Sequence, residues 1–259
     1  MLYQNSITAV ITAFNSAKYI DKSIESVLKQ TINIKKLIVV DDFSQDFREL
    51  EIQINKIKVK NKSIDIDIIK NDQNKGPGFS RNIAWSKVDT EYIAFLDSDD
   101  IWKIDKIENQ LKIFNLKKNI SLVASAKDRK IKNFKTGFAN IDKMIFRNLV
   151  PLSSVLIKSK IPHRFEEKYY AEDYELWLNF LFDNLNIYII NEVLCFENKN
   201  VIKKNLSNDY LAMTIETQKT LSKFLIKNKK YFFYILIAKF FEIIKFFIRV
   251  KRYKKLKIK

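Results

Sequence analysis

Apolar runs and helix-like patterns alternate along the first hundred residues of the chain. Four short runs rich in β-branched residues have the length of buried strands. Between them, apolar residues recur at the 3.6-residue spacing of helices in three segments. The predicted strands are Ser6–Ala13, Leu37–Val40, Ile64–Ile69 and Tyr92–Leu96, and the predicted helices are Ala17–Gln30, Phe47–Val59 and Pro77–Lys87. This alternation predicts an α/β fold with a mostly parallel central sheet flanked by helices. In the less regular second half, the predicted strands are Ser153–Ile157 and Ile187–Ile190, and the predicted helix is Asp173–Phe182.

The C-terminal segment has a different pattern. Residues 231–250 read YFFYILIAKFFEIIKFFIRV, and their polar positions fall on one stripe, roughly 120° wide on a helix. These polar positions are Lys239, Glu242, Lys245 and Arg249, and the basic run KRYKKLKIK follows. The pattern is typical of a basic amphipathic helix that lies in a membrane interface. The alternative is a helix that packs its broad apolar face on the domain or on a second copy of the chain.

The charge of the chain favours an anionic partner. The 259 residues carry a formal net charge of +17, and residues 227–259 hold 12 basic residues and one acidic residue, so +11 of that charge lies there. Such a charge suits nucleic acid or an anionic membrane. Because the charge accompanies a broad apolar face and no nucleic-acid module is recognisable, we expect no nucleic-acid partner. The prediction is contact of residues 230–259 with an anionic inner-membrane surface.

The sequence contains no uninterrupted stretch of about 18 apolar residues. Its first residues have neither the basic nor the long apolar region of a secretory signal. These features predict a cytoplasmic protein that is peripheral on the inner face of the cytoplasmic membrane.

The chain contains one cysteine, Cys195, and one histidine, His163. An intramolecular disulfide and a zinc site built from these residue types are therefore excluded. A divalent metal must be held mainly by carboxylates, which suits Mg²⁺ or Mn²⁺. Both residues are expected to be structural.

The strongest local signal is the acidic run Asp97-Ser98-Asp99-Asp100, which ends an apolar strand. Three carboxylates this close repel one another unless a cation lies between them. In an extended stretch Asp97 and Asp99 point the same way, so they can share one metal ion. The alternative is a solvated acidic turn in which Asp100 caps a following helix.

Weaker signals lie near other predicted elements. Asp41 and Asp42 follow the second strand, either as a turn or as acceptors for a nucleobase N–H. Arg81 lies one turn into the third helix, where it can pair with a diphosphate or with an acidic neighbour. Because ligands bind at the carboxyl ends of strands in such sheets, Asn15, these aspartates and Asp97–Asp100 are expected at that edge.

Glu172 and Asp173 form a carboxylate pair at the start of a predicted helix, in AEDYELW. Acidic residues in a first turn are favoured by the helix dipole, which is one explanation. The other is a general base near the metal site that takes a proton from an attacking hydroxyl.

Four segments occur in order: ITAFNSAKYIDKSIESVLKQT, LIVVDDFSQD, NKGPGFSRNIAWSKVDTEYIAFLDSDDIW and AEDYELWL. Together they resemble glycosyltransferase family 2, a group of inverting, nucleotide-diphosphosugar-dependent enzymes with the GT-A fold. The resemblance covers about Ser6–Leu178 and is of the bacterial surface-polysaccharide type. It implies a GT-A domain at 1–205, with a nucleotide-binding half at about 1–100 and an acceptor half at about 101–205. A helical, basic amphipathic extension follows at 206–259.

The resemblance implies roles on the donor side. Phe14 would lie near the ring of the nucleobase. Asp42 would accept a hydrogen bond from the base, and Asp41 would support the turn that holds Asp42. Arg81 would approach the diphosphate, and Asp97 would contact the ribose or a metal-bound water. The residues expected to bind the nucleotide-sugar are Thr12, Ala13, Phe14, Asn15, Asp41, Asp42, Arg81, Asp97 and Ser98.

The resemblance also implies the metal ligands and the base. Asp97 and Asp99 match the DxD element, with Asp99 the direct ligand of Mn²⁺ or Mg²⁺, and Asp173 matches the catalytic base. Trp102 and Trp177 would either stack on sugar rings or pack in the core. The residues expected on the acceptor side are Ser153, Ser154, Glu172 and Trp177.

The implied reaction is a metal-assisted single displacement. The metal and Arg81 would neutralise charge on the departing nucleoside diphosphate, while Asp173 deprotonates an acceptor hydroxyl and the configuration inverts. The expected donor is a UDP-hexose or a UDP-N-acetylhexosamine. The expected acceptor is a glycan or glycolipid in lipooligosaccharide, capsule or O-antigen synthesis. The alternative is a catalytically inactive family member that acts as a membrane-bound assembly partner, and the tail also offers a homodimer interface.

Overall fold

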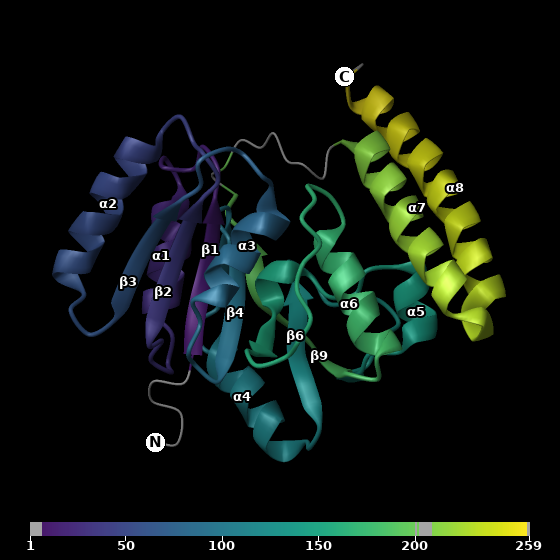
Figure 1. The fold of residues 1–259 in the computed structure, drawn as a ribbon, viewed down its shortest axis with the longest axis horizontal. Coiled ribbons are helices and arrows are strands. Elements are labelled where there is room, and N and C mark those ends of the chain that lie inside the picture. The colour runs from purple at the N-terminus through teal and green to yellow at the C-terminus, as the bar shows by residue number, and fades with distance from the viewer. Residues whose placement is uncertain (1–6, 200, 202–208, 258–259) are drawn as a thin grey trace.

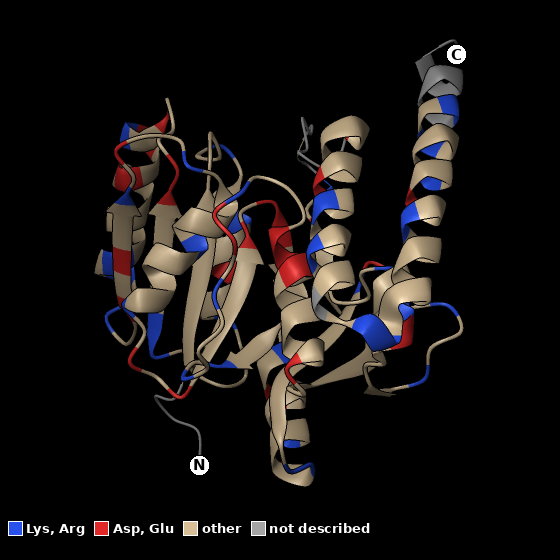
Figure 2. Ribbon diagram, turned by 45° about the vertical axis from the view of Figure 1, so that its right-hand side comes forward, with Lys and Arg blue, Asp and Glu red and all other residues tan. Residues whose placement is uncertain are grey.

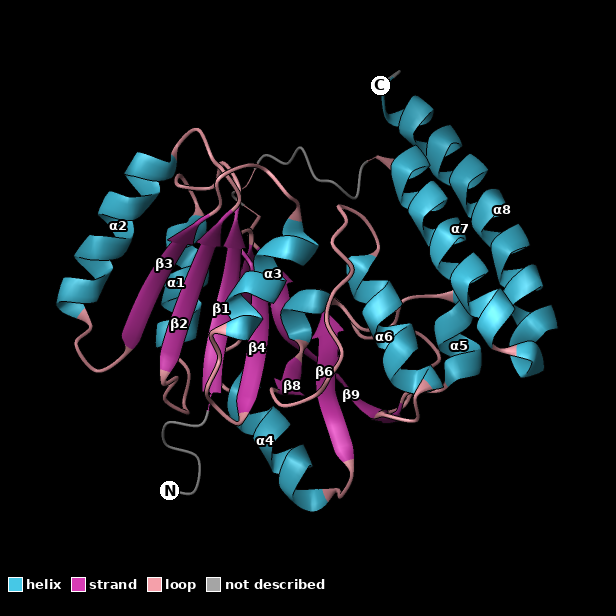
Figure 3. Ribbon diagram, viewed as in Figure 1, coloured by secondary structure: helices cyan, strands magenta, loops and turns pink. Residues whose placement is uncertain are grey.

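A nine-stranded sheet with helices on both faces forms the centre of the computed structural model, which describes residues 7–199, 201 and 209–257 (Figure 1 and Figure 3). Ser6 and the predicted domain boundary between 205 and 206 lie outside the described residues. The strands are β1 (Ile7–Ala13), β2 (Lys36–Asp41), β3 (Asp65–Lys70), β4 (Tyr92–Asp97), β5 (Asp100–Trp102), β6 (Ile120–Lys127), β7 (Gly137–Phe138), β8 (Leu156–Lys158) and β9 (Asn186–Glu197). The helices are α1 (Ile20–Leu28), α2 (Phe47–Lys60), α3 (Pro77–Ser86), α4 (Lys106–Leu116), α5 (Ile141–Phe146), α6 (Glu172–Phe182), α7 (Tyr210–Lys227) and α8 (Phe232–Lys257), with 3-10 turns η1 (Leu152–Ser154) and η3 (Lys229–Tyr231).

The strand order is β3-β2-β1-β4-β8-β6-β9-β5, and β7 pairs with β9. β1 pairs in parallel with β2 and β4, and β2 pairs in parallel with β3. The short strand β8 is antiparallel to both β4 and β6, and it joins the first half of the sheet to the second. The predicted α/β fold is confirmed: the four strands of the alternating pattern form one continuous parallel block, and β6 also pairs in parallel with β9.

Successive residues of the central strands face opposite layers of helices, which produces two cores. On β1, Val10 belongs to the cluster that contains Trp85 of α3, whereas Ile11 belongs to the cluster that contains Ile24 of α1. All four side chains are buried. Burial on both faces explains why these strands appear in the sequence as continuous apolar runs rather than as an alternation.

The predicted strand over Ser153–Ile157 is wrong in its extent. Leu152–Ser154 forms the 3-10 turn η1, and only Leu156–Lys158 is a strand. The Ser154 hydroxyl donates to the Pro151 carbonyl at 2.7 Å, and such local bonds from serine compete with an extended backbone. The predicted Ile187–Ile190 strand is one part of the longer β9, and β5, α4, β6, β7 and α5 had no counterpart in the prediction.

Glu175 of α6 fixes α7 to the rest of the molecule. Its side chain is 2% exposed and accepts from Lys168 Nζ at 2.6 Å, from Lys223 Nζ at 2.7 Å and from Thr220 Oγ1 at 3.0 Å. Burial raises the pKa of Glu175, but these donors together hold that pKa below its ordinary value. Thr220 and Lys223 belong to α7. Their hydrogen bonds to the buried Glu175 carboxylate therefore hold α7 against α6.

The polar stripe of α8 faces the molecule and not the solvent. Lys239 Nζ donates to Ser222 Oγ of α7 at 2.5 Å, and Lys245 Nζ donates to the Phe146 carbonyl of α5 at 2.6 Å. Ile235 and Ala238 continue the same side of the helix and are buried. The alternative prediction, in which the broad apolar face packs on the domain, is therefore wrong for the side chains that the structure describes.

The rest of α8 exposes its apolar side chains. Eleven of them between Phe232 and Ile248 are exposed, and we call this surface the outer face of α8. Phe233, Phe240 and Phe247 are 75%, 63% and 65% exposed. In Figure 2 the helix that ends at the C-terminus is tan between blue basic positions spaced along it. Within the described part of the chain, no helix combines the length and apolar character needed to cross a bilayer.

Lys106 of α4 is a buried cation in the core. Its Nζ donates to Gln110 Oε1 at 2.8 Å and to the Val155 carbonyl at 3.3 Å, and it lies 4.2 Å from the centroid of the Trp102 ring. Burial lowers the pKa of Lys106 to about 7. The unfolded chain binds this proton up to the ordinary pKa of 10.5, so the unfolded state holds more protons between these two values.

We therefore expect Lys106 to make the free energy of unfolding rise with pH between about 7 and about 10.5, by about 1.4 kcal/mol per pH unit. The variant Lys106→Met should lack this contribution. Urea unfolding at pH 7.5 and 9.5 measures it as a difference of about 2–3 kcal/mol between the pH responses of wild type and variant. Lys118→Met, at an exposed position, is the matched control. Equal pH responses in wild type and Lys106→Met would show that the pKa of this lysine is ordinary.

Candidate active site

The carboxyl ends of three parallel strands bring the predicted donor-side residues together. Ala13 at the end of β1 lies opposite Asp41 at the end of β2, and Thr12 lies opposite Asp97 at the end of β4. Residues from three distant parts of the sequence thus share one edge of the sheet. This is the edge at which ligands bind in open α/β sheets.

The loops after β1 and β2 are tied to each other. The Asn15 backbone N–H donates to Ser44 Oγ at 2.8 Å, and Asn15 Oδ1 accepts from the Gln45 N–H at 2.9 Å. Asn15 has a φ of 49°, a left-handed conformation that asparagine tolerates better than most residues. Phe14 beside it is 49% exposed, so an aromatic ring is held at the surface of this edge.

Asp42 organises the next loop. Its Oδ1 accepts from Asn71 Nδ2 at 2.8 Å and from the Lys75 N–H at 2.9 Å, and its Oδ2 accepts from the Gly76 N–H at 2.8 Å. Gly76 has a φ of 86°, which favours glycine, and it is the N-cap residue directly before α3. Both oxygens of Asp42 are thus engaged by the chain itself.

Asp41 has a different environment. It is fully buried, its Oδ2 accepts from the Ser44 N–H at 2.9 Å, and its Oδ1 has no hydrogen-bond partner among the described residues. A buried carboxylate oxygen without a donor is costly unless a ligand supplies one. Of the two neighbouring aspartates, Asp41 is therefore the one with a free acceptor.

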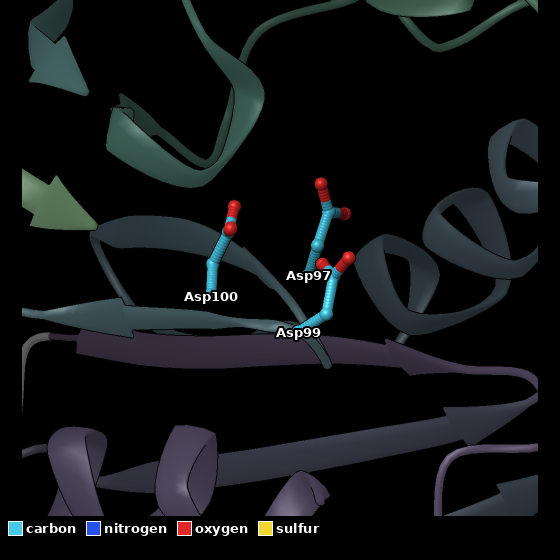
Figure 4. A group of neighbouring side chains, drawn as sticks. All are labelled: Asp97, Asp99 and Asp100. Atoms are coloured by element: carbon cyan, nitrogen blue, oxygen red, sulfur yellow. The ribbon is translucent and has the colours of Figure 1, made fainter. Parts of the chain in front are cut away.

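Asp97, Asp99 and Asp100 form an acidic cluster at the turn between β4 and β5. One carboxylate oxygen from each lies within 4.8 Å of the others, and Figure 4 shows the three side chains projecting to the same side. Asp100 begins a strand, so the alternative in which it caps a following helix is wrong. Asp97 and Asp99 were predicted as ligands from the sequence and Asp100 was not, because only the first two are spaced to share a face of an extended strand.

Asp100 is fully buried in this cluster. Its Oδ2 accepts from Lys127 Nζ at 2.6 Å and from the Ser153 hydroxyl, whereas its Oδ1 has no partner among the residues described. Burial and the neighbouring Asp97 raise the pKa of Asp100 to about 7, against the effect of Lys127. Burial lowers the pKa of Lys127, but Asp100 and Asp97 raise it above its ordinary value.

The acidic cluster fits a hard divalent cation. Its donors are carboxylate oxygens, which are the ligands that Mg²⁺ and Mn²⁺ prefer. The buried, unpartnered Oδ1 of Asp100 beside two further carboxylates is the environment that a positive charge would stabilise. The residues that would hold the ion are Asp97, Asp99 and Asp100.

Arg81 connects the acidic cluster to the start of α6. Its side chain is 5% exposed, with Nη2 at 2.9 Å from Asp97 Oδ1 and Nη1 at 2.5 Å from Glu172 Oε1. Burial lowers the pKa of Arg81, but the two carboxylates raise it above its ordinary value. Burial raises the pKa of Glu172 to about 7 although Arg81 lowers it. The pairing of Arg81 with acidic neighbours is thus observed, while its contact with a diphosphate stays a prediction.

Asp173 lies next to this buried ion pair and is partly exposed. Its Oδ1 accepts from the Tyr174 N–H at 2.6 Å, and its Oδ2 accepts from Asn148 Nδ2 at 3.0 Å. Burial raises the pKa of Asp173, against the hydrogen bonds from Tyr174 and Asn148. A carboxylate with a raised pKa and an exposed edge can act as a general base. Asn148 was not predicted, because it follows α5 and no pattern in the sequence relates it to Asp173.

Ser98 and Ser153 are buried beside the acidic cluster. The Ser98 carbonyl accepts from Ser23 Oγ at 2.7 Å. Ser153 Oγ accepts from the Asp97 N–H at 3.1 Å and donates to Asp100. Ser153 therefore positions the acidic cluster. This role differs from the prediction, which had Ser153 on the acceptor side.

Two of the predicted acceptor-side residues lie in the interior. Trp177 and Ser154 are 0% exposed. The Trp177 indole N–H donates to the Val150 carbonyl at 3.1 Å, and Ser154 Oγ accepts from the Ser125 N–H at 3.3 Å. The prediction that they contact the acceptor is wrong, because both side chains are enclosed by the core. Trp102 is also buried, so core packing is the correct alternative for both tryptophans.

The fold is that of GT-A glycosyltransferases. It matches the Staphylococcus aureus TarS structure of residues 1–349 with a TM-score of 0.63 at 16% identity, covering 83% of this chain and 65% of that chain. It matches the mannosyltransferase PcManGT from Pyrobaculum calidifontis, in complex with GDP-Man and Mn²⁺, with a TM-score of 0.69 at 14% identity, covering 85% of this chain and 64% of that chain. The chain thus spans slightly less than two thirds of the length of these two structures.

Residues 8–166 match the model of glycosyl transferase family 2, and the chain belongs to this family. Over 195 residues it is 33% identical to the Escherichia coli UDP-Glc:alpha-D-GlcNAc-diphosphoundecaprenol beta-1,3-glucosyltransferase WfgD, covering 71% of this chain and 73% of the relative. Over 247 residues it is 31% identical to a glycosyltransferase of Methanocaldococcus jannaschii, covering 87% of this chain and 81% of the relative. The protein is a glycosyltransferase.

Proposed function

We propose that the protein transfers a sugar from a UDP-hexose or UDP-N-acetylhexosamine to a hydroxyl of a glycolipid acceptor, with inversion, in surface-polysaccharide synthesis. The observation that carries this proposal is the chain of contacts Asp97–Arg81–Glu172, which connects the acidic cluster to the segment that holds Asp173. The name of WfgD specifies a UDP-glucose donor and a GlcNAc-diphosphoundecaprenol acceptor. The TarS structure in complex with UDP-GlcNAc supports a UDP-sugar donor as well.

On the donor side, we assign the nucleotide to the edge formed by Thr12, Ala13 and the loop of Phe14 and Asn15. The unpartnered Asp41 Oδ1 supports Asp41, in place of Asp42, as the acceptor for a base N–H. The exposed Phe14 ring would stack on the base.

On the acceptor side, Asp173 takes the proton of the acceptor hydroxyl as that oxygen attacks the anomeric carbon from the face opposite the diphosphate. The bond to the diphosphate breaks in the same step, so the configuration inverts and no covalent enzyme intermediate forms. Asn148 holds the Asp173 carboxylate, and Glu172 holds Arg81. A divalent cation at Asp97, Asp99 and Asp100 would supply positive charge to stabilise the departing diphosphate.

The proposal includes a division of the chain into a catalytic domain at 1–205 and a membrane-associating extension at 206–259. The outer face of α8 is apolar, and Lys251, in the basic run that follows, is exposed. An apolar helix face beside basic residues suits the surface of an anionic bilayer. This would keep the enzyme at the inner face of the cytoplasmic membrane, where a glycolipid acceptor is reached.

We expect the triple variant Phe233→Ser, Phe240→Ser and Phe247→Ser to bind vesicles of phosphatidylglycerol at least tenfold more weakly than wild type. Burying one such side chain contributes about 1.5–3 kcal/mol to the free energy of binding, so the loss of three should weaken binding by at least this factor. Co-sedimentation measures the binding, and the matched control is Ile52→Ser, Val59→Ser and Leu116→Ser, at exposed positions of α2 and α4. If wild type ignores vesicles but dissociates from dimer to monomer in the triple variant, the face is a homodimer interface and the membrane assignment is wrong.

A donor screen tests the proposed reaction. The protein is given UDP-glucose, UDP-N-acetylglucosamine and GDP-mannose with Mn²⁺ or Mg²⁺, and release of nucleoside diphosphate is measured without and with a GlcNAc-diphospho-decyl acceptor. Metal-dependent release from a UDP-sugar, lost in Asp99→Ala, is the expected result. If no donor is turned over and none raises the melting temperature, the chain is an inactive family member.

A further inference from the structure

A strongly basic pocket of about 750 Å³ lies on the half of the molecule that follows β5. Its volume is in the range of small-molecule sites. It is lined by the segment after β6, by the residues after α5 and by the end of β9. The acidic residues in its lining are Asp128 and Glu197, and the basic ones are Lys127, Arg129, Lys130, Lys132, Arg147 and Lys199.

Most of this positive charge has no acidic counterpart among the residues that the structure describes. Arg129, Lys130, Lys132 and Arg147 are exposed, and in the described part of the chain none of them has an ion-pair partner. Asp128 is engaged locally, since its Oδ1 accepts from the Glu197 N–H at 2.7 Å. Several like charges around one concave volume raise the local potential and attract an anion that carries more than one charge. Arginine and lysine together are suited to phosphate oxygens.

The pocket adjoins both the acidic cluster and the candidate base. Lys127, in its lining, donates to Asp100 Oδ2 at 2.6 Å. Asn148, also in its lining, donates to Asp173 Oδ2 at 3.0 Å. An anion in this pocket would therefore lie beside the position of the attacking hydroxyl. The loops assigned to the nucleotide, which follow β1 and β2, contribute no residue to it.

The pocket also lies next to the packing contact of α8. Arg147 directly follows Phe146, the last residue of α5. The Phe146 carbonyl accepts from Lys245 of α8, and the Phe146 ring lies 6.1 Å from that of Phe241 of α8. The helix with the exposed apolar face and the basic pocket are thus joined through the end of α5.

We propose that this pocket binds the diphosphate group of a lipid-linked acceptor, while the sugar hydroxyl of that acceptor is at Asp173. The inference rests on the proposed function, and it adds the site and the chemical class of the group that recognises the acceptor. A diphosphate diester carries two negative charges, which matches a pocket with several unpaired cations. The lipid chain attached to it would extend toward the outer face of α8.

The test is a comparison of two acceptors with the full chain and its best donor. One acceptor is GlcNAc-diphospho-decyl, and the other is the decyl glycoside of GlcNAc, which lacks the diphosphate. The pocket variant is Lys130→Gln with Arg147→Gln. The control is Lys118→Gln with Arg48→Gln, which removes one lysine and one arginine from exposed positions outside the pocket.

We expect the pocket variant to raise KM for the diphosphate acceptor at least tenfold. KM for the decyl glycoside, KM for the donor and slow donor hydrolysis should match those of the control. Equal KM values for the diphosphate acceptor in pocket variant and control would overturn the proposal, and so would equal increases for both acceptors.

Binding without turnover separates this proposal from the proposed function. Decyl diphosphate is titrated calorimetrically into wild type, pocket variant and control in the absence of donor and metal. At least tenfold weaker binding to the pocket variant alone supports the site even if no donor is turned over. If UDP displaces decyl diphosphate and the pocket variant loses affinity for UDP equally, the pocket holds the diphosphate of the donor and the proposal is wrong.

Discussion

Replacing Asp173 by asparagine is expected to lower the rate of sugar transfer by about 10²–10⁴-fold, which is the usual contribution of a general base. The substitution removes the acceptor for Asn148 Nδ2, whose Oδ1 is held by the Val150 N–H, but it keeps the shape of the side chain and an oxygen for the Tyr174 N–H. The loss should therefore appear in kcat, with KM for the donor unchanged. Initial rates of transfer to a GlcNAc-diphospho-decyl acceptor measure it.

The control for this experiment is Asp183→Asn. Asp183 is an exposed carboxylate at the other end of the same helix, where it is hydrogen-bonded to His163. It should leave kcat within twofold of wild type. Melting temperatures of both variants establish that the helix still folds. A fully active Asp173→Asn enzyme would assign the proton transfer to another group, with Glu172 the nearest carboxylate along the chain.

Arg81→Met is expected to lower the free energy of unfolding by about 3–5 kcal/mol, the usual cost of removing one partner of a buried ion pair. The change leaves Glu172, whose side chain is 9% exposed, and Asp97 without their shared cation. Uncompensated carboxylates in a low-dielectric environment are strongly destabilising. Urea unfolding monitored by tryptophan fluorescence measures the effect.

Two further variants identify the cause of that loss. Arg48→Met, at an exposed position that has no ion pair with any described residue, should change the free energy of unfolding by no more than about 0.5 kcal/mol. Adding Glu172→Gln to Arg81→Met should recover part of the stability, because it removes one of the unpaired charges. If Arg81→Met costs less than about 1 kcal/mol, the pair contributes little and Arg81 is free to contact substrate.

The alternating pattern of the first hundred residues was sufficient to predict the parallel block formed by β1 to β4. Each run such as Leu37–Val40 fits a strand that is buried on both faces, because such a strand must be apolar throughout. The acidic cluster was located for the same kind of reason, since Asp97 and Asp99 are local neighbours. The predictions that failed concern longer distances. Nothing near Trp177 in the sequence indicates that β-strands and α5 enclose it.

The partners of the candidate site residues were set by the tertiary structure. Asp41 and Asp42 are equivalent in the sequence, and only the loop that contains Asn71 makes Asp42 a structural residue and leaves Asp41 with a free oxygen. Asp100 joins its neighbours because Lys127 and Ser153 hold its carboxylate in place. These contacts come from residues 27 or more positions away, which no local pattern encodes.

The orientation of α8 shows the same difference between what the sequence determines and what the tertiary structure decides. The spacing of Lys239, Glu242, Lys245 and Arg249 determined that one narrow stripe of the helix is polar and that the rest is apolar. It did not determine which side meets the protein. The carbonyl of Phe146 and the hydroxyl of Ser222 accept from the two lysines, so the polar stripe turns inward and the apolar arc outward. Periodicity is a property of neighbouring residues, whereas the surface that a helix face meets depends on groups brought near it by the whole fold.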